Sequence, residues 1–285
     1  MSNREGNSVF EGGTPRPGAA GMPTRNVMKD DFGLEIPAEQ IPIPSGGRVY
    51  SSDSPLYNRE TVEIRPMTAR EEDILTSKAL IKKGTVITEL IRSCLIDKSI
   101  DPDDMIVGDR NAVMTALRIT GYGADYTVDV ECPACGERSR QEFDLSELPL
   151  KRLGADPTSE GENTFEFTLP YTKKAVKFRF LTGRDETQIS KMQDRKKKHS
   201  FTKDNLITTR YKHQIISIAG ITDKVKIEFF IKNMPAKDSR ALRKFMDDNE
   251  PGVEMKSWMD CPSCMETSEV RLPLGASFFW PDSNS

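Results

Sequence analysis

The sequence has few of the residues that most often do chemistry. It contains only two histidines, His199 and His213, and neither has a serine, cysteine or aspartate partner at an informative spacing. A phosphate-binding loop, a GxSxG motif and an HExxH motif are all absent from it. We therefore find no catalytic machinery in the sequence and expect a protein that is not an enzyme.

Long hydrophobic runs are also absent. No apolar stretch approaches the roughly 20 residues that span a bilayer. Residues 1–21 are polar and rich in glycine and proline, without the apolar core of a secretory signal. We expect no membrane contact and a protein that is made and kept in a reducing cytoplasm, or that leaves it only by cell lysis. In that compartment, paired cysteines indicate metal or redox sites before disulfides.

The chain has little excess of either charge. Its 285 residues include 41 basic and 44 acidic ones, so the net charge is −3. A near-neutral chain does not favour nucleic-acid binding. One basic run, residues 195–199, falls at the end of an expected helix, where cations favour the helix dipole. A contact with an acidic partner is the alternative for this run.

Cysteine is scarce, but four of the five cysteines form two Cys-Pro-X-Cys pairs between strand-like segments. The metal ligands we predict are Cys132, Cys135, Cys261 and Cys264. Two such knuckles supply the four thiolates that structural zinc prefers, and they leave no open position for a catalytic water. The pairs are 125 residues apart, because 261 − 135 − 1 = 125. A thioredoxin-like redox pair and two knuckles without metal are the alternatives. Cys94, on the apolar face of an expected helix, is read as a buried small hydrophobe.

The pattern along the chain predicts an α+β fold. Helical segments surround β-hairpins, and the two sequence-distant knuckles form one composite four-Cys zinc ribbon. A capping box at Thr68 and Glu71 opens a helix that we expect to reach Lys82 and to stop at Gly84. Asp109 is expected to cap a later helix. We also expect one helix over residues 205–219, and residues 225–231 fit either a strand or a helix.

Composition divides the chain into four predicted parts. Residues 1–58, rich in proline and glycine, form an N-terminal arm that is either disordered or extended against a neighbouring subunit. Residues 59–152 hold the first helices and the first knuckle. Residues 153–252 form an inserted domain of one hairpin and several helices, and residues 253–285 hold the second knuckle and an aromatic tail.

The aromatic tail ends in Phe278, Phe279 and Trp280. Three neighbouring aromatic side chains are unfavourable in water, so they either fold back onto the core or dock on a neighbouring subunit. Aromatic anchors dominate many protein interfaces. We name these three residues as candidate partner-binding residues.

The order of these features resembles the T4-type bacteriophage baseplate hub family. The resemblance spans roughly residues 61–281. It is carried by the segments 67–72, 91–97, 132–135, 233–240, 261–264 and 278–281. It implies a structural virion protein in the baseplate of a contractile tail, which binds hub or wedge neighbours, in multiple copies of a symmetric assembly. Two other functions stay open: an assembly chaperone absent from the mature virion, and a zinc-ribbon regulator that binds nucleic acid.

Overall fold

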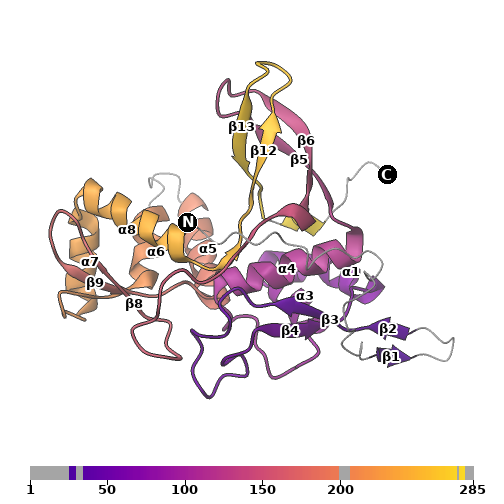
Figure 1. Cartoon of the computed structure of the whole chain (residues 1–285), viewed down its shortest axis with the longest axis horizontal. Coiled ribbons are helices and arrows are strands. Elements are labelled where there is room, and N and C mark those ends of the chain that lie inside the picture. The colour runs from indigo at the N-terminus through magenta and orange to yellow at the C-terminus, as the bar shows by residue number, and fades with distance from the viewer. Residues whose placement is uncertain (1–25, 30–34, 199–205, 275, 280–285) are drawn as a thin grey trace, which may run out of the picture.

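The computed structural model describes residues 26–29, 35–198, 206–274 and 276–279. Figure 1 shows a helical half on one side, an inserted lobe on the other, and two β-hairpins that project from between them. The sheets of this described part have two or three strands each, and helices surround them. The α+β prediction is confirmed.

The helical half is built around one buried helix, α4 (Val107–Tyr122). Its residues 112–119 are buried on every side of the helix, as expected where other elements enclose a helix completely. The preceding part of the chain supplies β3 (Glu39–Pro42) and α3 (Val86–Cys94), which contact α4, together with β4 (Thr61–Ile64), α1 (Ala69–Thr76) and α2 (Lys78–Lys83). Later segments of the chain contact α4 as well, most of all residues 252–253.

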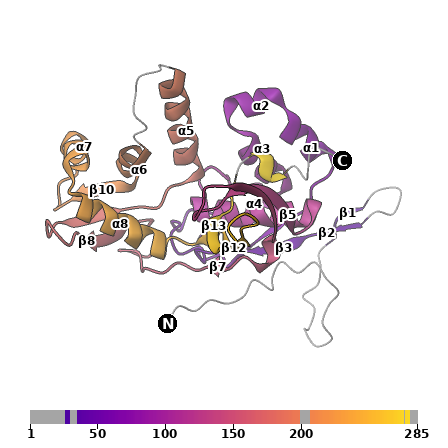
Figure 2. The same ribbon diagram turned by 90° about the horizontal axis from the view of Figure 1, so that it is seen from above.

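The signals for helix starts and stops were partly confirmed. Thr68 and Glu71 form the predicted capping box, and Gly84 ends α2 with a left-handed φ of 70°. The single helix expected up to Lys82 is instead divided at Ser77, whose ψ of 104° is extended. The break lets α1 and α2 take different directions, so that α1 packs against α3 (Figure 2).

Residues 41–50 and Leu56 lie mostly in the core, although they fall in the predicted arm. Strand β3 pairs antiparallel with β4, and Ile43, Val49 and Leu56 in the following loop are buried. The sequence pattern alone did not predict that these apolar side chains are buried. Further upstream, β1 (Asn26–Lys29) pairs with β2 (Glu35–Pro37). The rest of the predicted arm, residues 1–25 and 30–34, lies outside the described residues.

Asp109 holds the buried loop in place instead of capping α4. The helix begins two residues earlier, at Val107. The carboxylate of Asp109 accepts hydrogen bonds from the Ser45 backbone N–H (2.9 Å), the Ser45 hydroxyl (2.6 Å) and the Tyr50 hydroxyl (2.6 Å). Burial raises the pKa of Asp109 to about 6, although these hydrogen bonds lower it. A residue expected to serve its own helix therefore joins two segments about 60 residues apart.

The inserted lobe has a three-stranded antiparallel sheet with the order β10-β9-β8. The expected helix over residues 205–219 ends at Gln214, and Ile215–Ile218 instead form β10 on the edge of β9. β-branched isoleucines suit a strand once a partner edge is available. The ambiguous segment 225–231 is helical. The lobe contains β8 (Phe165–Thr168), β9 (Ala175–Phe178), β10, α5 (Gly183–Lys198), α6 (Leu206–Gln214), α7 (Lys224–Asn233) and α8 (Ala236–Asn249).

Phenylalanines fill the core of the inserted lobe. The rings of Phe165 and Phe180 have centroids 4.6 Å apart, and Phe178 lies within 6 Å of both. Phe245 of α8 stacks on Phe167 with centroids 4.6 Å apart. Aromatic pairs of this kind stabilise by about 1 kcal/mol beyond their burial. These rings hold the lobe together within the single hydrophobic core of the described residues.

The chain enters and leaves the inserted lobe through one antiparallel pair, β7 (Leu150–Lys151) with β11 (Gly252–Val253). β7 ends two residues before residue 153 and β11 begins at residue 252, and these two residues stay the predicted boundaries of the inserted domain. The strand pair rests on α4 at Gly108, where an added Cβ would come within 1.7 Å of the Pro251 carbonyl oxygen. Only glycine permits this close approach, and the approach anchors both connections to α4.

The aromatic tail folds back onto its own chain. Phe278 and Phe279 lie in the 3-10 helix η3 (Ala276–Phe279), and both side chains are fully buried. The Phe278 ring meets the Tyr126 ring edge-on at 5.2 Å, and its carbonyl accepts from Nε of the buried Arg118 at 3.0 Å. These two residues are therefore core residues rather than exposed partner-binding ones. Trp280 lies outside the described residues.

Candidate metal centre

Two β-hairpins form the projection at the top of Figure 1, and their turns carry the four predicted cysteines. The first hairpin is β5 (Asp125–Glu131) with β6 (Arg138–Asp144), and the second is β12 (Lys256–Asp260) with β13 (Thr267–Arg271). Both alternate exposed and more buried residues, with Val130, Phe143, Met259 and Val270 buried. This alternation is the period-2 pattern of strands with one covered face.

The two turns have the same backbone hydrogen bonds. In the first turn, Cys132 N–H donates to the Glu137 carbonyl at 2.9 Å, and Gly136 N–H donates to the Cys132 carbonyl at 2.8 Å. In the second turn, Cys261 N–H donates to the Glu266 carbonyl at 3.1 Å, and Met265 N–H donates to the Cys261 carbonyl at 2.9 Å. Each turn therefore presents its two thiols to the same side.

The four sulfur atoms gather in one cluster, and all lie within 4.8 Å of one another. Cys132 Sγ is 3.8 Å from Cys264 Sγ, and Cys135 Sγ is 3.6 Å from Cys261 Sγ. Four thiolates around zinc, each about 2.3 Å from the ion, lie about 3.8 Å apart at the corners of a tetrahedron. The separations across the two hairpins match this arrangement, and a metal could bind between the four sulfurs.

The pKa values of the thiols in the cluster are shifted in different directions. The backbone N–H groups of Cys264 and Ser263 lower the pKa of Cys261 to about 6. The backbone N–H of Glu266 lowers the pKa of Cys264. Burial and the adjacent thiols outweigh it, so the pKa is raised overall. Neighbouring thiols oppose the accumulation of negative charge at short range. A divalent cation would remove this conflict, because it favours deprotonation of every ligand thiol.

The geometry separates the four-cysteine cluster from a disulfide and from a thioredoxin-like redox pair. The sulfur separations are far above the roughly 2.05 Å of a disulfide bond, and the four cysteines are free. Each pair lies in a turn between strands, whereas a thioredoxin-like pair uses the N-terminus of a helix. Cys94 is fully buried in α3, and burial raises its pKa to about 12. Its thiol is therefore protonated at neutral pH.

Other candidate groups are held by structural contacts. The acidic residues between α3 and α4 bind arginines: Asp97 pairs with Arg59 at 2.8 Å, and Asp101 pairs with Arg92 at 2.9 Å. His213 Nδ1 lies 3.5 Å from Asp185, which also pairs with Arg179. Across the ranges that the structure describes, the four cysteines are the one cluster with metal-ligand geometry. His199 lies outside those ranges.

Sequence reasoning missed two surfaces that the structure exposes. Trp258 on β12 is 67% exposed, and Phe229 on α7 is 71% exposed. The available signal for Trp258 was its position in an alternating strand, where it points to the face opposite that of the next residue, the buried Met259. For Phe229, the signal was that apolar residues occupy two opposite faces of one short helix. Neither signal distinguishes an exposed side chain from a buried one until the packing of the element is known.

The model of the family described as T4 bacteriophage base plate protein matches residues 42–280, which is most of the chain. The match begins inside the buried segment 39–58 and ends beyond the second knuckle, so it covers both halves of the cysteine cluster. No curated protein and no solved structure matches the chain. Among the described residues, no helix is long and apolar enough to cross a bilayer.

Proposed function

Since the chain belongs to the T4 bacteriophage base plate protein family, we propose that it is a structural subunit of the hub of a contractile-tail baseplate. The family supports a structural role in the baseplate and a place in the tail of the virion. The observation that carries the proposal is the family match over residues 42–280. The absence of a catalytic constellation in the sequence agrees with a structural role.

We assign the cysteine cluster a structural zinc ion, bound by Cys132, Cys135, Cys261 and Cys264. Four cysteine ligands complete a tetrahedral site and leave no position for substrate or water. The ion would join the hairpin that precedes the inserted lobe to the hairpin that follows it. Its role in the proposed function is to keep the hairpin projection in one shape on a subunit that must match its neighbours.

The proposed partners are other hub or wedge proteins, with several copies of this chain in a symmetric assembly. The family implies contacts with other baseplate components. Exposed apolar side chains outside the core, such as Phe229, Val225 and Trp258, suit such contacts. The nucleic-acid alternative gains nothing from the knuckles, because acidic residues outnumber basic ones in both hairpins.

Quantitative mass spectrometry of purified phage particles tests the proposal. We expect the protein in the particles at a constant ratio to other tail proteins through successive purification steps. A protein abundant in infected cells but absent from finished particles would be an assembly chaperone, and the structural proposal would be wrong. A host cytosolic protein measured in the same samples gives the level of contamination.

A further inference from the structure

The four cysteines of the cluster differ in their access to solution. Cys132 and Cys261, the first cysteines of the two turns, are each 1% exposed. Cys135 and Cys264, the second cysteines, are exposed. Both turns lie at the outer end of the hairpin projection in Figure 1, away from the helices. Each hairpin therefore has one enclosed cysteine and one that a small molecule in solution can reach.

The sulfur contacts of the cluster run between the two hairpins. The exposed Cys135 has its sulfur 3.6 Å from that of the buried Cys261. The exposed Cys264 has its sulfur 3.8 Å from that of the buried Cys132. In both pairs, one sulfur belongs to the hairpin before the inserted lobe and the other to the hairpin after it. An exposed sulfur that becomes oxidised therefore has a sulfur of the opposite hairpin in contact with it.

Backbone hydrogen bonds in the second turn favour reaction at the exposed sulfur. The sulfur of Cys261 accepts from the backbone N–H groups of Ser263 and Cys264. The sulfur of Cys264 accepts from the backbone N–H of Glu266. A donated hydrogen bond stabilises the negative charge of a thiolate and lowers its nucleophilicity. With fewer such bonds, Cys264 is the stronger nucleophile of this turn.

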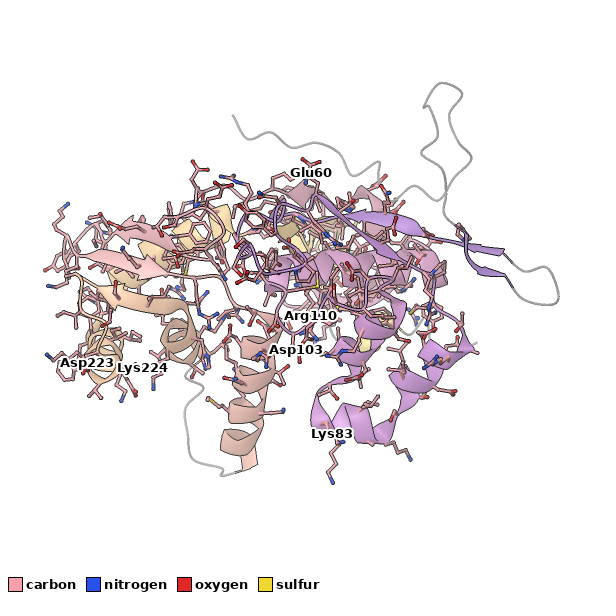
Figure 3. All side chains as sticks on the ribbon, turned by 90° about the horizontal axis from the view of Figure 1, so that it is seen from below. Glu60, Lys83, Asp103, Arg110, Asp223 and Lys224 are labelled. Atoms are coloured by element: carbon pink, nitrogen blue, oxygen red, sulfur yellow. The ribbon has the colours of Figure 1, made fainter. Side chains whose placement is uncertain are left out.

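Two other groups that could carry chemistry are closed off. Cys94 is fully buried in α3, so a solute does not reach its thiol. Near the start of α4, the Thr88 hydroxyl accepts from Arg110 at 2.9 Å and donates to Asp103 at 2.7 Å. Figure 3 shows Arg110 and Asp103 close together. These polar groups bind one another, whereas the exposed cysteines of the cluster face solution.

We propose that Cys135 and Cys264 are sites of oxidation by hydrogen peroxide. Each then forms a disulfide with the sulfur that it contacts in the opposite hairpin, as Cys135–Cys261 and Cys132–Cys264. Bound to a divalent cation, the four sulfurs are thiolates at neutral pH, which is the form that attacks a peroxide. Thiolate character, exposure and a second cysteine in contact are the features of redox-sensitive cysteines. The disulfides join the same two hairpins that the metal joins.

The reaction balances with one peroxide for each disulfide. The thiolate sulfur of Cys135 attacks one oxygen of the peroxide, the O–O bond breaks and hydroxide leaves, so that the sulfur becomes a sulfenic acid. The thiolate of Cys261 then attacks this sulfur, the S–O bond breaks and a second hydroxide leaves. The two sulfurs together lose two electrons, which the peroxide gains. The site has then lost two of its four ligands and no longer holds a metal.

The charge around the two turns favours an uncharged oxidant such as hydrogen peroxide. Residues 131–138 and 260–267 contain 1 basic and 4 acidic residues, so their net charge is 1 − 4 = −3. The one basic residue, Arg138, already pairs with Glu131 at 3.6 Å. An anionic thiol reagent should therefore react more slowly than a neutral reagent of the same chemistry, and added salt should reduce the difference.

This inference rests on the proposed metal centre, because the metal holds the sulfurs as thiolates in one cluster. It adds a second means of joining the hairpins, one that persists where no reducing cytoplasm maintains the thiols. The zinc content before oxidation tests the metal centre. The pairing of the cysteines after oxidation tests this inference, so the two can fail separately.

Peptide mapping of the full-length, zinc-loaded protein after treatment with hydrogen peroxide tests the pairing. After free thiols are alkylated, trypsin releases the first turn in peptide 119–138 and the second turn in peptide 257–271. We expect disulfides between these two peptides, with Cys135 and Cys264 no longer alkylated and Cys94 still alkylated. A colorimetric chelator should record the release of about one zinc ion per chain, and a thiol reductant with added zinc should reverse it.

The chelated, reduced protein is the matched control for the joining of the hairpins. Chelation and peroxide both remove the metal, but only peroxide leaves covalent links between the two hairpins. Hydrogen exchange in β5, β6, β12 and β13 should therefore be slower in the oxidised protein than in the chelated one. Cys94→Ala, which removes the fifth thiol, should show the same zinc release and the same pairing.

Three results would overturn the proposal. The first is zinc retained at peroxide concentrations that oxidise a free cysteine peptide in the same solution. The second is a set of disulfides formed within the turns, Cys132–Cys135 and Cys261–Cys264. The third is oxidised protein whose hairpins exchange as fast as those of the chelated protein. A protein purified without zinc would contradict the metal centre, while the pairing of its cysteines after peroxide still decides this inference.

Discussion

Glu71 shows how one buried side chain joins three segments of the helical half. Its carboxylate is fully buried and accepts hydrogen bonds from Arg65 (2.7 and 2.9 Å), the Thr68 backbone and hydroxyl (2.9 and 2.7 Å) and the Ser93 hydroxyl (2.6 Å). Burial alone would raise the pKa of Glu71, but these donors outweigh it and hold the pKa well below its usual range. The capping box recognised in the sequence is therefore also the anchor of α3 and β4.

Replacing Glu71 by glutamine should lower the free energy of unfolding by about 3 kcal/mol at pH 7, because the partly buried Arg65 loses the counter-charge of the buried Glu71. The folded-state pKa of Glu71 lies below the unfolded value of about 4.3. Its stabilisation is therefore complete above that pH and is lost as the pH falls toward the folded-state pKa. Urea unfolding of both proteins should show a smaller difference at pH 3 than at pH 7.

Both proteins in that comparison are measured with a chelator present, so that acid-driven release of metal does not differ between them. Glu72→Gln, at the exposed neighbouring position, should change stability by less than about 0.5 kcal/mol. An equal effect of Glu71→Gln at pH 7 and pH 3 would show that its charge contributes nothing.

At the scale of the element, the two knuckle turns differ at two positions, Ala134 against Ser263 and Gly136 against Met265, and only the second pair has left-handed φ. Gly136 and Met265 both have left-handed φ, and a Cβ on Gly136 would meet nothing within 4 Å. Substitution at Gly136 therefore tests backbone conformation without a steric clash. The two turns are otherwise alike in their backbone hydrogen bonds.

Gly136→Ala should lower the stability of the zinc-loaded protein by about 1 kcal/mol, because alanine is disfavoured at positive φ. Met265→Gly should leave stability unchanged or slightly higher, since relief of the same strain offsets the greater freedom of glycine in the unfolded chain. Thermal unfolding of the two variants measures both effects. A stabilising Gly136→Ala would contradict the assigned turn geometry.

Elements also changed type where a neighbour was available. Residues 215–218 continue a helical pattern in sequence, yet they pair with β9 because three isoleucines can complete that edge. The single helix expected after Thr68 divides at Ser77, so that α1 can pack on α3. In both places, the burial gained by tertiary contact exceeds the small differences in local propensity.

At the scale of the whole molecule, the cysteine cluster closes the long insertion. The β7–β11 pair joins the two connections on α4, and the cluster joins them again in the projection above. Beyond β13, the chain continues to η3, where Arg118 holds the Phe278 carbonyl. Loss of a bound metal would therefore act on the projection and on the C-terminal segment together.

Freshly purified protein should contain about one zinc ion per chain, and Cys135→Ser should lose it, because three thiolates do not complete the site. Structural zinc contributes on the order of 10 kcal/mol in small modules, so chelation should strongly destabilise the hairpins. Hydrogen exchange followed by mass spectrometry should rise in β5, β6, β12, β13 and η3.

Strands β8–β10 of the inserted lobe should keep their protection after chelation, because phenylalanine rings that pack on one another hold the lobe together. A uniform rise in exchange across both regions would contradict this expectation. Zinc well below one ion per two chains in unchelated protein would contradict the metal assignment itself.

The sequence by itself determined the local features: the paired Cys-Pro-X-Cys turns, the hairpins around them, the capping box at Thr68 and Glu71, and the α+β class. Each depends on residues close together in the chain, where spacing and side-chain chemistry suffice. Only the tertiary structure decided that most of residues 41–50 are core, that Phe278 and Phe279 fold inward, and that Phe229 and Trp258 face outward. These outcomes depend on which distant surfaces meet, and burial against a partner segment has no local signature in the sequence.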